Sequence, residues 1–163
     1  MPRLGITIES HGGPRATAKA FRAATKEAYF ELLQTWHRRF LPGHFAAGAV
    51  GKYDYQPRTA AYMRRKARTK HHQKPLVWSG ETLAAVRRRV DIKVKATRHE
   101  ATGVASMFGP QHLYAYRKGR GASDKAMEMV STTDGELVAF AQLIERKVAR
   151  RLDQVRTVTR RVA

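Results

Sequence analysis

Apolar and polar residues alternate over residues 3 to 9, and this period of two predicts a short half-buried strand. Residues 10 to 14 are typical of a turn. From Arg15 to Leu41 the apolar residues recur every three or four positions, which predicts a long amphipathic helix that Pro42-Gly43 ends. The recurring positions are Phe21, Ala24, Ala28, Leu32, Trp36 and Phe40.

Two more residues, Tyr29 and Leu33, widen this apolar stripe. We therefore expect a helix that packs against other elements on two sides. We interpret its aromatic residues as core packing, because an apolar stripe at helical spacing is usually a buried face.

The next segment is dense in turn signals. Residues 44 to 55 are rich in glycine and aromatic residues, which favours a loop. Gln56-Pro57 is a suitable helix start, because proline is tolerated in the first turn of a helix. The helix expected over residues 58 to 70 has a thin apolar face, so we do not expect it to be a central core element. Residues 71 to 73 break its pattern.

An apolar stretch, Pro75 to Trp78, follows and is expected to be extended and packed. Ser79 is a suitable N-cap for a short helix through Val86. An acid in the first turn of this helix, Glu81, and the arginines at its end both complement the helix dipole.

Residues 90 to 96 alternate again, and residues 101 to 108 do so less cleanly. With a turn near residues 98 and 99, they predict an antiparallel hairpin. Residues 109 to 123 contain several glycines and basic residues, which is typical of a long flexible loop. Met127 and Met129 point the same way in a further expected strand.

The final helix has the clearest start signal in the chain. Thr133 and Glu136 stand three residues apart, as in a capping box. Behind them the apolar residues keep a steady helical spacing, and the basic tail 156–163 is expected to fray. The spaced positions are Leu137, Phe140, Ile144, Val148, Leu152 and Val155.

These elements predict an α+β fold, in which a small antiparallel sheet packs with a long N-terminal helix and a C-terminal helix. The 163 residues suffice for one ordinary domain with a hydrophobic core. We expect a single domain, 1–163, with residues 53–80 as a protruding basic arm and 109–123 as a flexible loop.

The balance of charge is unusual: 32 Lys and Arg against 13 Asp and Glu give a formal charge of +19. Such an excess suits an acidic partner, above all a phosphate backbone, with anionic lipid second. No apolar run approaches the about 20 residues that span a bilayer, and the N-terminus lacks a signal-peptide core. We expect no membrane partner. With no cysteine, disulfides and thiolate metal sites are excluded.

Enzymatic motifs are missing from the sequence. No pair of acids suggests a hydrolytic site, no serine stands in a nucleophile elbow, and no P-loop occurs. The seven histidines lack metal-ligand spacing. We therefore expect neither an enzyme nor a cofactor or metal.

The basic arm is more informative, because it contains no acid from Pro57 to Lys74. Arg64, Arg65 and Arg68 share a helix face that could line phosphates, although a merely solvated face is an equal alternative for any one residue. No base-reading motif accompanies them. Candidate DNA or partner contacts are Arg58, Arg64, Arg65, Arg68, Lys70, Lys74, Arg87, Arg88, Arg117, Lys118 and Arg120, and candidate anchors are Tyr62, Leu76 and Trp78.

This stretch also carries a family resemblance. A spaced run of Tyr, Arg, Tyr and Lys, then a basic break, then P-L-x-x-[ST]-G and a short helix with a leucine, resembles the virion-morphogenesis and tail-completion proteins of long-tailed bacteriophages. The order of elements around it agrees over most of the chain. The matching residues are Tyr55, Arg58, Tyr62, Lys66, Pro75, Leu76, Ser79, Gly80 and Leu83.

The resemblance implies a structural subunit of a ring, often hexameric or dodecameric, at the head–tail junction or tail end of the virion. Its implied partners are further copies of itself, connector, tail-terminator or tail-tube proteins, and the genomic DNA in the channel. Before assembly it would stand in the host cytoplasm. The resemblance carries no catalytic residues, and the charge of +19 departs from the more acidic balance of the family.

An alternative is a free-standing basic protein that binds nucleic acid, such as an RNA- or ribosome-associated factor. A phage-type nuclease is disfavoured, because the acid cluster that such an enzyme needs is missing.

Overall fold

A computed structural model of the chain describes residues 3–9, 15–97, 100–109 and 125–161. The chain divides into two compact units. The sheet unit comprises Leu4–Thr35, Ile92–Ala105 and Asp134–Ala163, and the arm unit comprises Met1–Arg3, Trp36–Asp91 and Ser106–Thr133. We describe each unit by itself. The single domain expected from the chain length stays a prediction.

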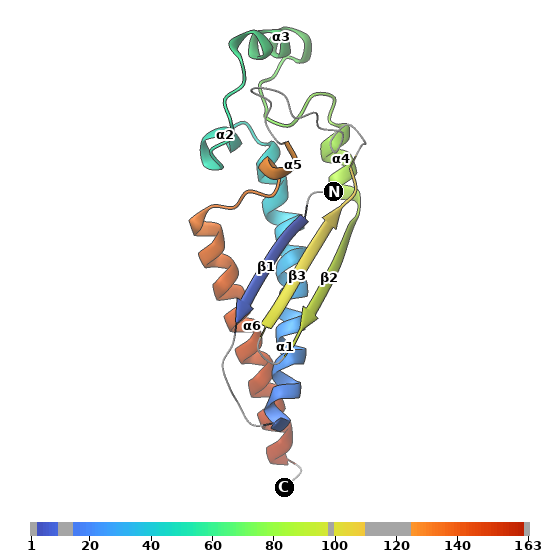
Figure 1. Cartoon of the computed structure of the whole chain (residues 1–163), viewed down its shortest axis with the longest axis vertical. Coiled ribbons are helices and arrows are strands. Elements are labelled where there is room, and N and C mark those ends of the chain that lie inside the picture. The colour runs from blue at the N-terminus through green and yellow to red at the C-terminus, as the bar shows by residue number, and fades with distance from the viewer. Residues whose placement is uncertain (1–2, 10–14, 98–99, 110–124, 162–163) are drawn as a thin grey trace. The chain divides into compact units, whose positions relative to one another are not determined.

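The sheet unit is built on three strands, β1 (Arg3–Glu9), β2 (Val90–Ala96) and β3 (Glu100–Met107), in the order β1-β3-β2. The central strand, β3, runs opposite to both of its neighbours (Figure 1). The predicted antiparallel hairpin is therefore confirmed. Thr97 closes its turn, since its backbone N–H donates to the carbonyl of Glu100 at 2.7 Å.

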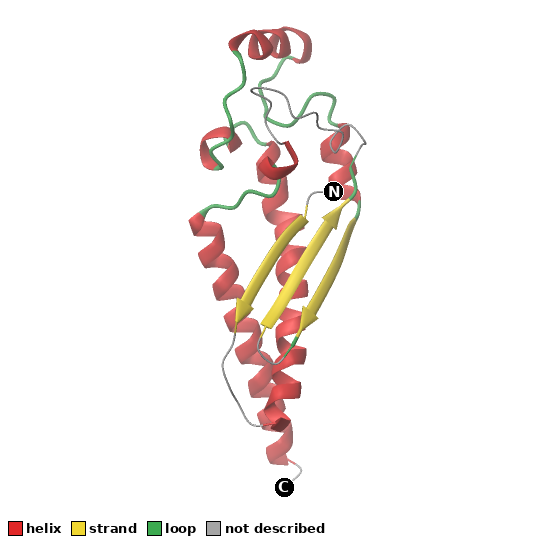
Figure 2. Cartoon of the chain, in the orientation of Figure 1, coloured by secondary structure: helices red, strands yellow, loops and turns green. Residues whose placement is uncertain are grey.

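Two long helices cover one face of this sheet (Figure 2). Helix α1 (Arg15–Thr35) contacts α6 (Asp134–Arg161) along much of its length. On its other side α1 approaches β3 so closely that a Cβ at Gly103 would lie 2.9 Å from Leu33 Cδ1 and 3.1 Å from Tyr29 Cδ1. The prediction of a helix packed on two sides is confirmed, and both widening residues are fully buried.

Salt bridges join the two helices where their apolar faces end. Lys147 Nζ lies 2.6 Å from Glu31, and Arg151 Nε lies 3.4 Å from Glu27. Because all four side chains are largely exposed, we expect each pair to add little stability. Burial of α6 residues such as Phe140 and Ile144 therefore dominates the contact.

The arm unit contains shorter elements. A π-helical turn η1 (Trp36–Phe40) and a 3₁₀ turn η2 (Leu41–Phe45) continue the chain after α1, and Pro42 stands in the first turn of η2. The other elements are α2 (Ala49–Lys52), α3 (Ala60–Lys70), α4 (Glu81–Arg88) and α5 (Lys125–Glu128).

The α+β class and the long terminal helices are confirmed, but several local predictions are wrong. The expected loop 44–55 contains α2. The expected strand at Met127 and Met129 is wrong, because residues 125–128 form α5. The start of α3 lies at Ala60 behind an N-cap at Thr59, later than Gln56-Pro57.

The segment after α3 also differs from expectation. Pro75 to Trp78 is a turn rather than an extended stretch, since Leu76 has a φ of 54°. Gly80, not Ser79, is the N-cap of α4. At the C-terminus, where fraying was expected, α6 continues to Arg161. Most of the expected flexible loop 109–123 lies outside the described residues.

Gly103 generates a stability prediction. Gly103→Val should lower the free energy of unfolding by about 1–3 kcal/mol, because its side chain must displace Tyr29 and Leu33 in a filled core. Urea unfolding followed by circular dichroism measures this. Gly135→Ala in the same unit is the control, since a Cβ there meets nothing within 4 Å. Equal stability of both variants would contradict the close packing.

Candidate functional site

The arm unit is held together around a buried histidine. The His44 ring is fully buried and stacks on Tyr53, with ring centroids 3.8 Å apart and planes inclined by 13°. Its Nδ1 lies 2.5 Å from Tyr55 Oη and 3.1 Å from the carbonyl oxygen of Glu128. A single imidazole therefore connects η2, the residues after α2, and α5.

A second polar link joins α5 to the start of the arm. Arg58 Nη2 lies 2.5 Å from Glu128 Oε2, and their side chains are 23% and 10% exposed. Arg58 was predicted to contact DNA or a partner, but the structure engages it in this internal ion pair. A similar link stands at α4, where His37 Nε2 lies 2.8 Å from the carbonyl oxygen of Val86.

Helix α3 carries the cations of the arm. Thr59 caps it by accepting a hydrogen bond from the Tyr62 N–H at 3.3 Å, and His71 ends it with a φ of 54°. Its apolar face is thin, as predicted, and Lys66 is its one buried residue among those described. The Lys66 ammonium donates to the carbonyl oxygen of Lys74, so the buried lysine holds the returning chain against the helix.

The chain then turns back through two left-handed residues, Leu76 (φ 54°) and Gly80 (φ 89°). This conformation costs a residue with a side chain about 1–3 kcal/mol. The Leu76 side chain packs against the buried cluster of Ala49, Tyr53 and Tyr55, and that packing offsets the strain. The geometry of the turn thus depends on a cluster formed more than twenty residues earlier in the chain.

These elements line a cavity of about 490 Å³ within the arm unit. This volume lies in the usual range of ligand and peptide-anchor pockets. The lining combines aliphatic side chains, aromatic rings, uncharged polar residues, two cations and one carboxylate, that of Glu81. Its aliphatic part includes Val50, Met63, Pro75, Leu76 and Val77, its rings are Tyr55, Tyr62 and Trp78, and its cations are Arg58 and Lys66.

Trp78 is the largest ring of the cavity and already contacts two cations. The Arg65 guanidinium lies 5.7 Å and the Lys70 ammonium 5.6 Å from its ring centroid. Its centroid is 5.9 Å from that of Tyr62, with the planes inclined by 35°. Cation–π contacts of this kind hold long basic side chains beside a ring. Trp78 therefore places two cations beside the cavity, whose lining also includes the carboxylate of Glu81.

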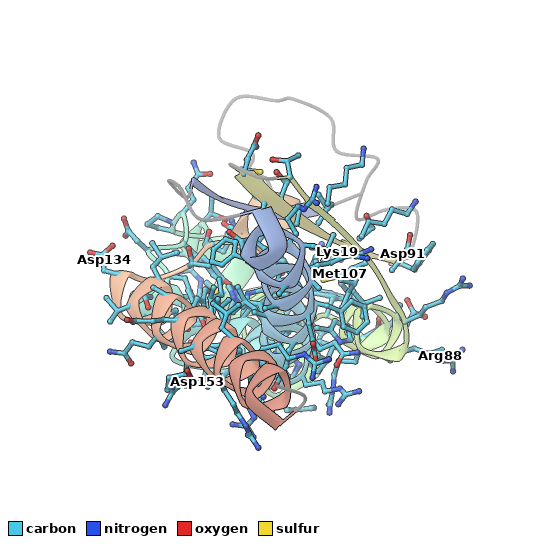
Figure 3. The ribbon with its side chains drawn as sticks, turned by 90° about the horizontal axis from the view of Figure 1, so that it is seen from below. Lys19, Arg88, Asp91, Met107, Asp134 and Asp153 are labelled. Carbon is cyan, nitrogen blue, oxygen red and sulfur yellow. The ribbon has the colours of Figure 1, made fainter. Side chains whose placement is uncertain are left out.

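The predicted contact residues fall into three groups. Most are exposed on α3, after it, or at the end of α4, where Figure 3 labels Arg88. Lys70 is half-buried beside Trp78, and Arg58 is paired internally. The exposed group is Arg64, Arg65, Arg68, Lys74, Arg87 and Arg88, whereas Arg117, Lys118 and Arg120 lie outside the described residues.

The three predicted anchors, Tyr62, Leu76 and Trp78, all line the cavity. So do seven of the nine residues on which the family resemblance rests. Of the other two, Gly80 caps α4 and Leu83 lies half-buried within it. The seven are Tyr55, Arg58, Tyr62, Lys66, Pro75, Leu76 and Ser79.

Sequence reasoning missed His44 and Glu128 as organising residues. Their contact spans 84 positions, and no local pattern reports such a distance. The aromatic content of residues 44–55 was the available signal, because rings clustered between two helices indicate a small buried cluster. It was interpreted as a loop instead.

Among the described residues, no three His, Cys, Asp or Glu side chains gather where they could hold a metal ion. No described helix is long and apolar enough to cross a membrane. Scans against family models, curated proteins and solved structures found no match for this chain.

The Arg58–Glu128 pair generates a prediction. Arg58→Met should destabilise the arm unit by about 1–3 kcal/mol, because it leaves the largely buried Glu128 carboxylate without its ion pair. Glu128→Gln should cost less, since a neutral amide replaces the charge. A double-mutant cycle on urea unfolding measures the coupling. Additive effects of the two substitutions would contradict a direct interaction.

His72 generates a pH prediction. Desolvation and the neighbouring ammonium groups of Lys66, Lys74 and Lys70 lower its pKa below the ordinary 6.5. As the pH falls below 6.5, His72 binds a proton more readily in the unfolded chain than in the folded one. The free energy of unfolding therefore decreases as the pH falls from 6.5 to the lower pKa of His72 in the folded chain. NMR titration of the imidazole should give a midpoint below 6.5, and Lys74→Gln should raise it. An unchanged midpoint in Lys74→Gln would contradict the electrostatic cause.

Proposed function

We propose that this chain is a structural subunit of the head–tail neck or tail-completion ring of a long-tailed bacteriophage, joining the tail to the head connector around the DNA channel. One observation carries the proposal: seven of the nine residues that resemble the tail-completion proteins line a single cavity. The seven come from both sides of the basic break. The cavity therefore brings together residues that are spaced along the sequence, as a common binding role would require.

In this proposal the cavity and its rim receive a neighbouring virion protein. The aliphatic part of the lining would take an apolar anchor, and the cations beside Trp78, Arg65 and Lys70, would favour an acidic surface next to it. The exposed face of Arg64, Arg65 and Arg68 would meet the same neighbour or the DNA in the channel. The formal charge of +19 suits a ring whose lumen holds DNA.

Particle incorporation tests the proposal. Tyr62→Ser removes a cavity ring that is 37% exposed, so it should spare the fold while lowering incorporation into virions by about tenfold or more. Ala61→Ser, exposed on the same helix outside the cavity, is the matched control. The measurement is the amount of each variant in purified particles.

Mass measurement of the chain, alone and with neighbouring virion proteins, supplies the second part of the test. A hexameric or dodecameric ring is the expected result. A strict monomer that never joins particles would overturn the proposed function.

The exposed arginines support a second candidate, a free-standing nucleic-acid-binding protein. This candidate predicts that the isolated monomer binds nucleic acid with sub-micromolar affinity and a steep salt dependence. Changing Arg64, Arg65 and Arg68 to Glu should then abolish binding, as measured by fluorescence anisotropy. Weak binding that these substitutions leave unchanged would eliminate this candidate.

A further inference from the structure

The sheet unit has an open groove between α1 and the edge strand β2, with a volume of about 630 Å³. Phe30 of α1 lies in this groove with 44% of its surface exposed. Ile92 and Val94 of β2 contribute half-buried aliphatic side chains. Full burial of one such large apolar side chain is worth about 1.5–3 kcal/mol, so the groove favours an apolar occupant.

The charge around the groove is positive. Lys26 of α1 and Lys93 and Lys95 of β2 line it and are exposed. Its one acid, Glu27, pairs with Arg151 at 3.4 Å. Lysines along an edge strand also discourage backbone pairing with another strand. A partner on this surface is therefore expected to bind through side chains and to bring acids with it.

The same unit carries a surface of the opposite character on α6. Six residues on one face of the helix are exposed, and each lies three or four positions from another member of the set. Two of them, Leu137 and Val138, are large apolar residues that are 49% and 57% exposed. The stripe begins and ends with an acid, and comprises Asp134, Leu137, Val138, Ala141, Gln142 and Glu145.

The stripe cannot reach the groove of its own chain. The N-terminal half of α6, which carries the stripe, lies on the β1 side of the sheet, whereas the groove borders the opposite edge strand β2 (Figure 1). Figure 3 shows Asp134 projecting outward from the N-terminal end of α6. The occupant must therefore come from another molecule.

We propose that the α6 stripe of one copy docks into the α1–β2 groove of the next copy. Leu137 and Val138 would cover Phe30, while the acids at the two ends of the stripe would meet the groove lysines. This is the helix-in-groove mode of recognition, with anchors at helical spacing. The inference rests on the proposed ring and names the surfaces that join its subunits.

Two features favour a second copy over other occupants. Nucleic acid would satisfy the lysines but would leave Phe30 without an apolar partner. The chain itself supplies an apolar stripe with acids at both ends, on the 28-residue helix α6. Because groove and stripe are different surfaces, the contact is head-to-tail, and repeated copies form a ring when the rotation between neighbours closes.

Charge reversal tests this pairing in the full chain. A groove variant, Lys93→Glu with Lys95→Glu, and a stripe variant, Asp134→Lys with Glu145→Lys, place like charges opposite each other. Each variant alone should weaken self-association on the order of a hundredfold. Mixed in equal amounts they should assemble again, because each reversed surface meets a complementary one on the other variant. Sedimentation velocity measures the assembly, and circular dichroism checks that both variants fold.

The matched control is Lys19→Glu with Arg22→Glu, which reverses two exposed cations of α1 outside the groove and should assemble like the unaltered chain. Assembly of either reversed variant alone would overturn the inference, as would a mixture of folded variants that stays monomeric. If the docking inference is overturned but the unaltered chain still forms rings, the proposed function remains supported. A groove variant that loses nucleic-acid binding but still forms rings would assign the groove to nucleic acid instead.

Discussion

The structure of the sheet unit depends on the burial of two opposite faces of helix α1. One face packs on the sheet, where Gly103 has no side chain and so lets α1 approach β3 closely. The other face packs on α6. A helix exposed on either side would leave Tyr29, Leu32 or Leu33 in water, each costing a few kcal/mol. The C-terminal helix is therefore needed to complete a core that the N-terminal helix begins.

The arm unit is organised differently, because its middle segment has few apolar residues to bury. Polar contacts hold its segments together. They are the hydrogen bonds of His44, the Arg58–Glu128 ion pair and the hydrogen bond from Lys66 to the carbonyl of Lys74. Buried polar links are costly when incomplete, and they specify geometry more narrowly than aliphatic contact does.

The sequence was most informative where the structure is periodic. The alternation in β1 and β2 predicted both strands at their observed bounds, and the three-or-four spacing predicted the starts of α1 and α6. The predicted end of the first helix at Leu41 is wrong, because α1 ends at Thr35 and residues 36–40 form the π-helical turn η1. The two methionines of α5 imitate a strand because a four-residue helix is too short to show its period. The turn at Leu76 was unpredictable locally, since a cluster of residues distant in sequence stabilises its left-handed backbone. The three candidate anchors Tyr62, Leu76 and Trp78 line the cavity, and their role as anchors stays a prediction. The polar links of His44 and Glu128 are long-range contacts without a local signature.

The placement of the two tryptophans has a practical consequence. Trp36 is fully buried and Trp78 is half-buried, and both belong to the arm unit. Most of the helical backbone, in contrast, belongs to α1 and α6 of the sheet unit. Tryptophan emission therefore observes one unit and far-ultraviolet dichroism mainly the other. The chain carries its own pair of spectroscopic reporters, which can show whether the two units melt in one cooperative step or in succession.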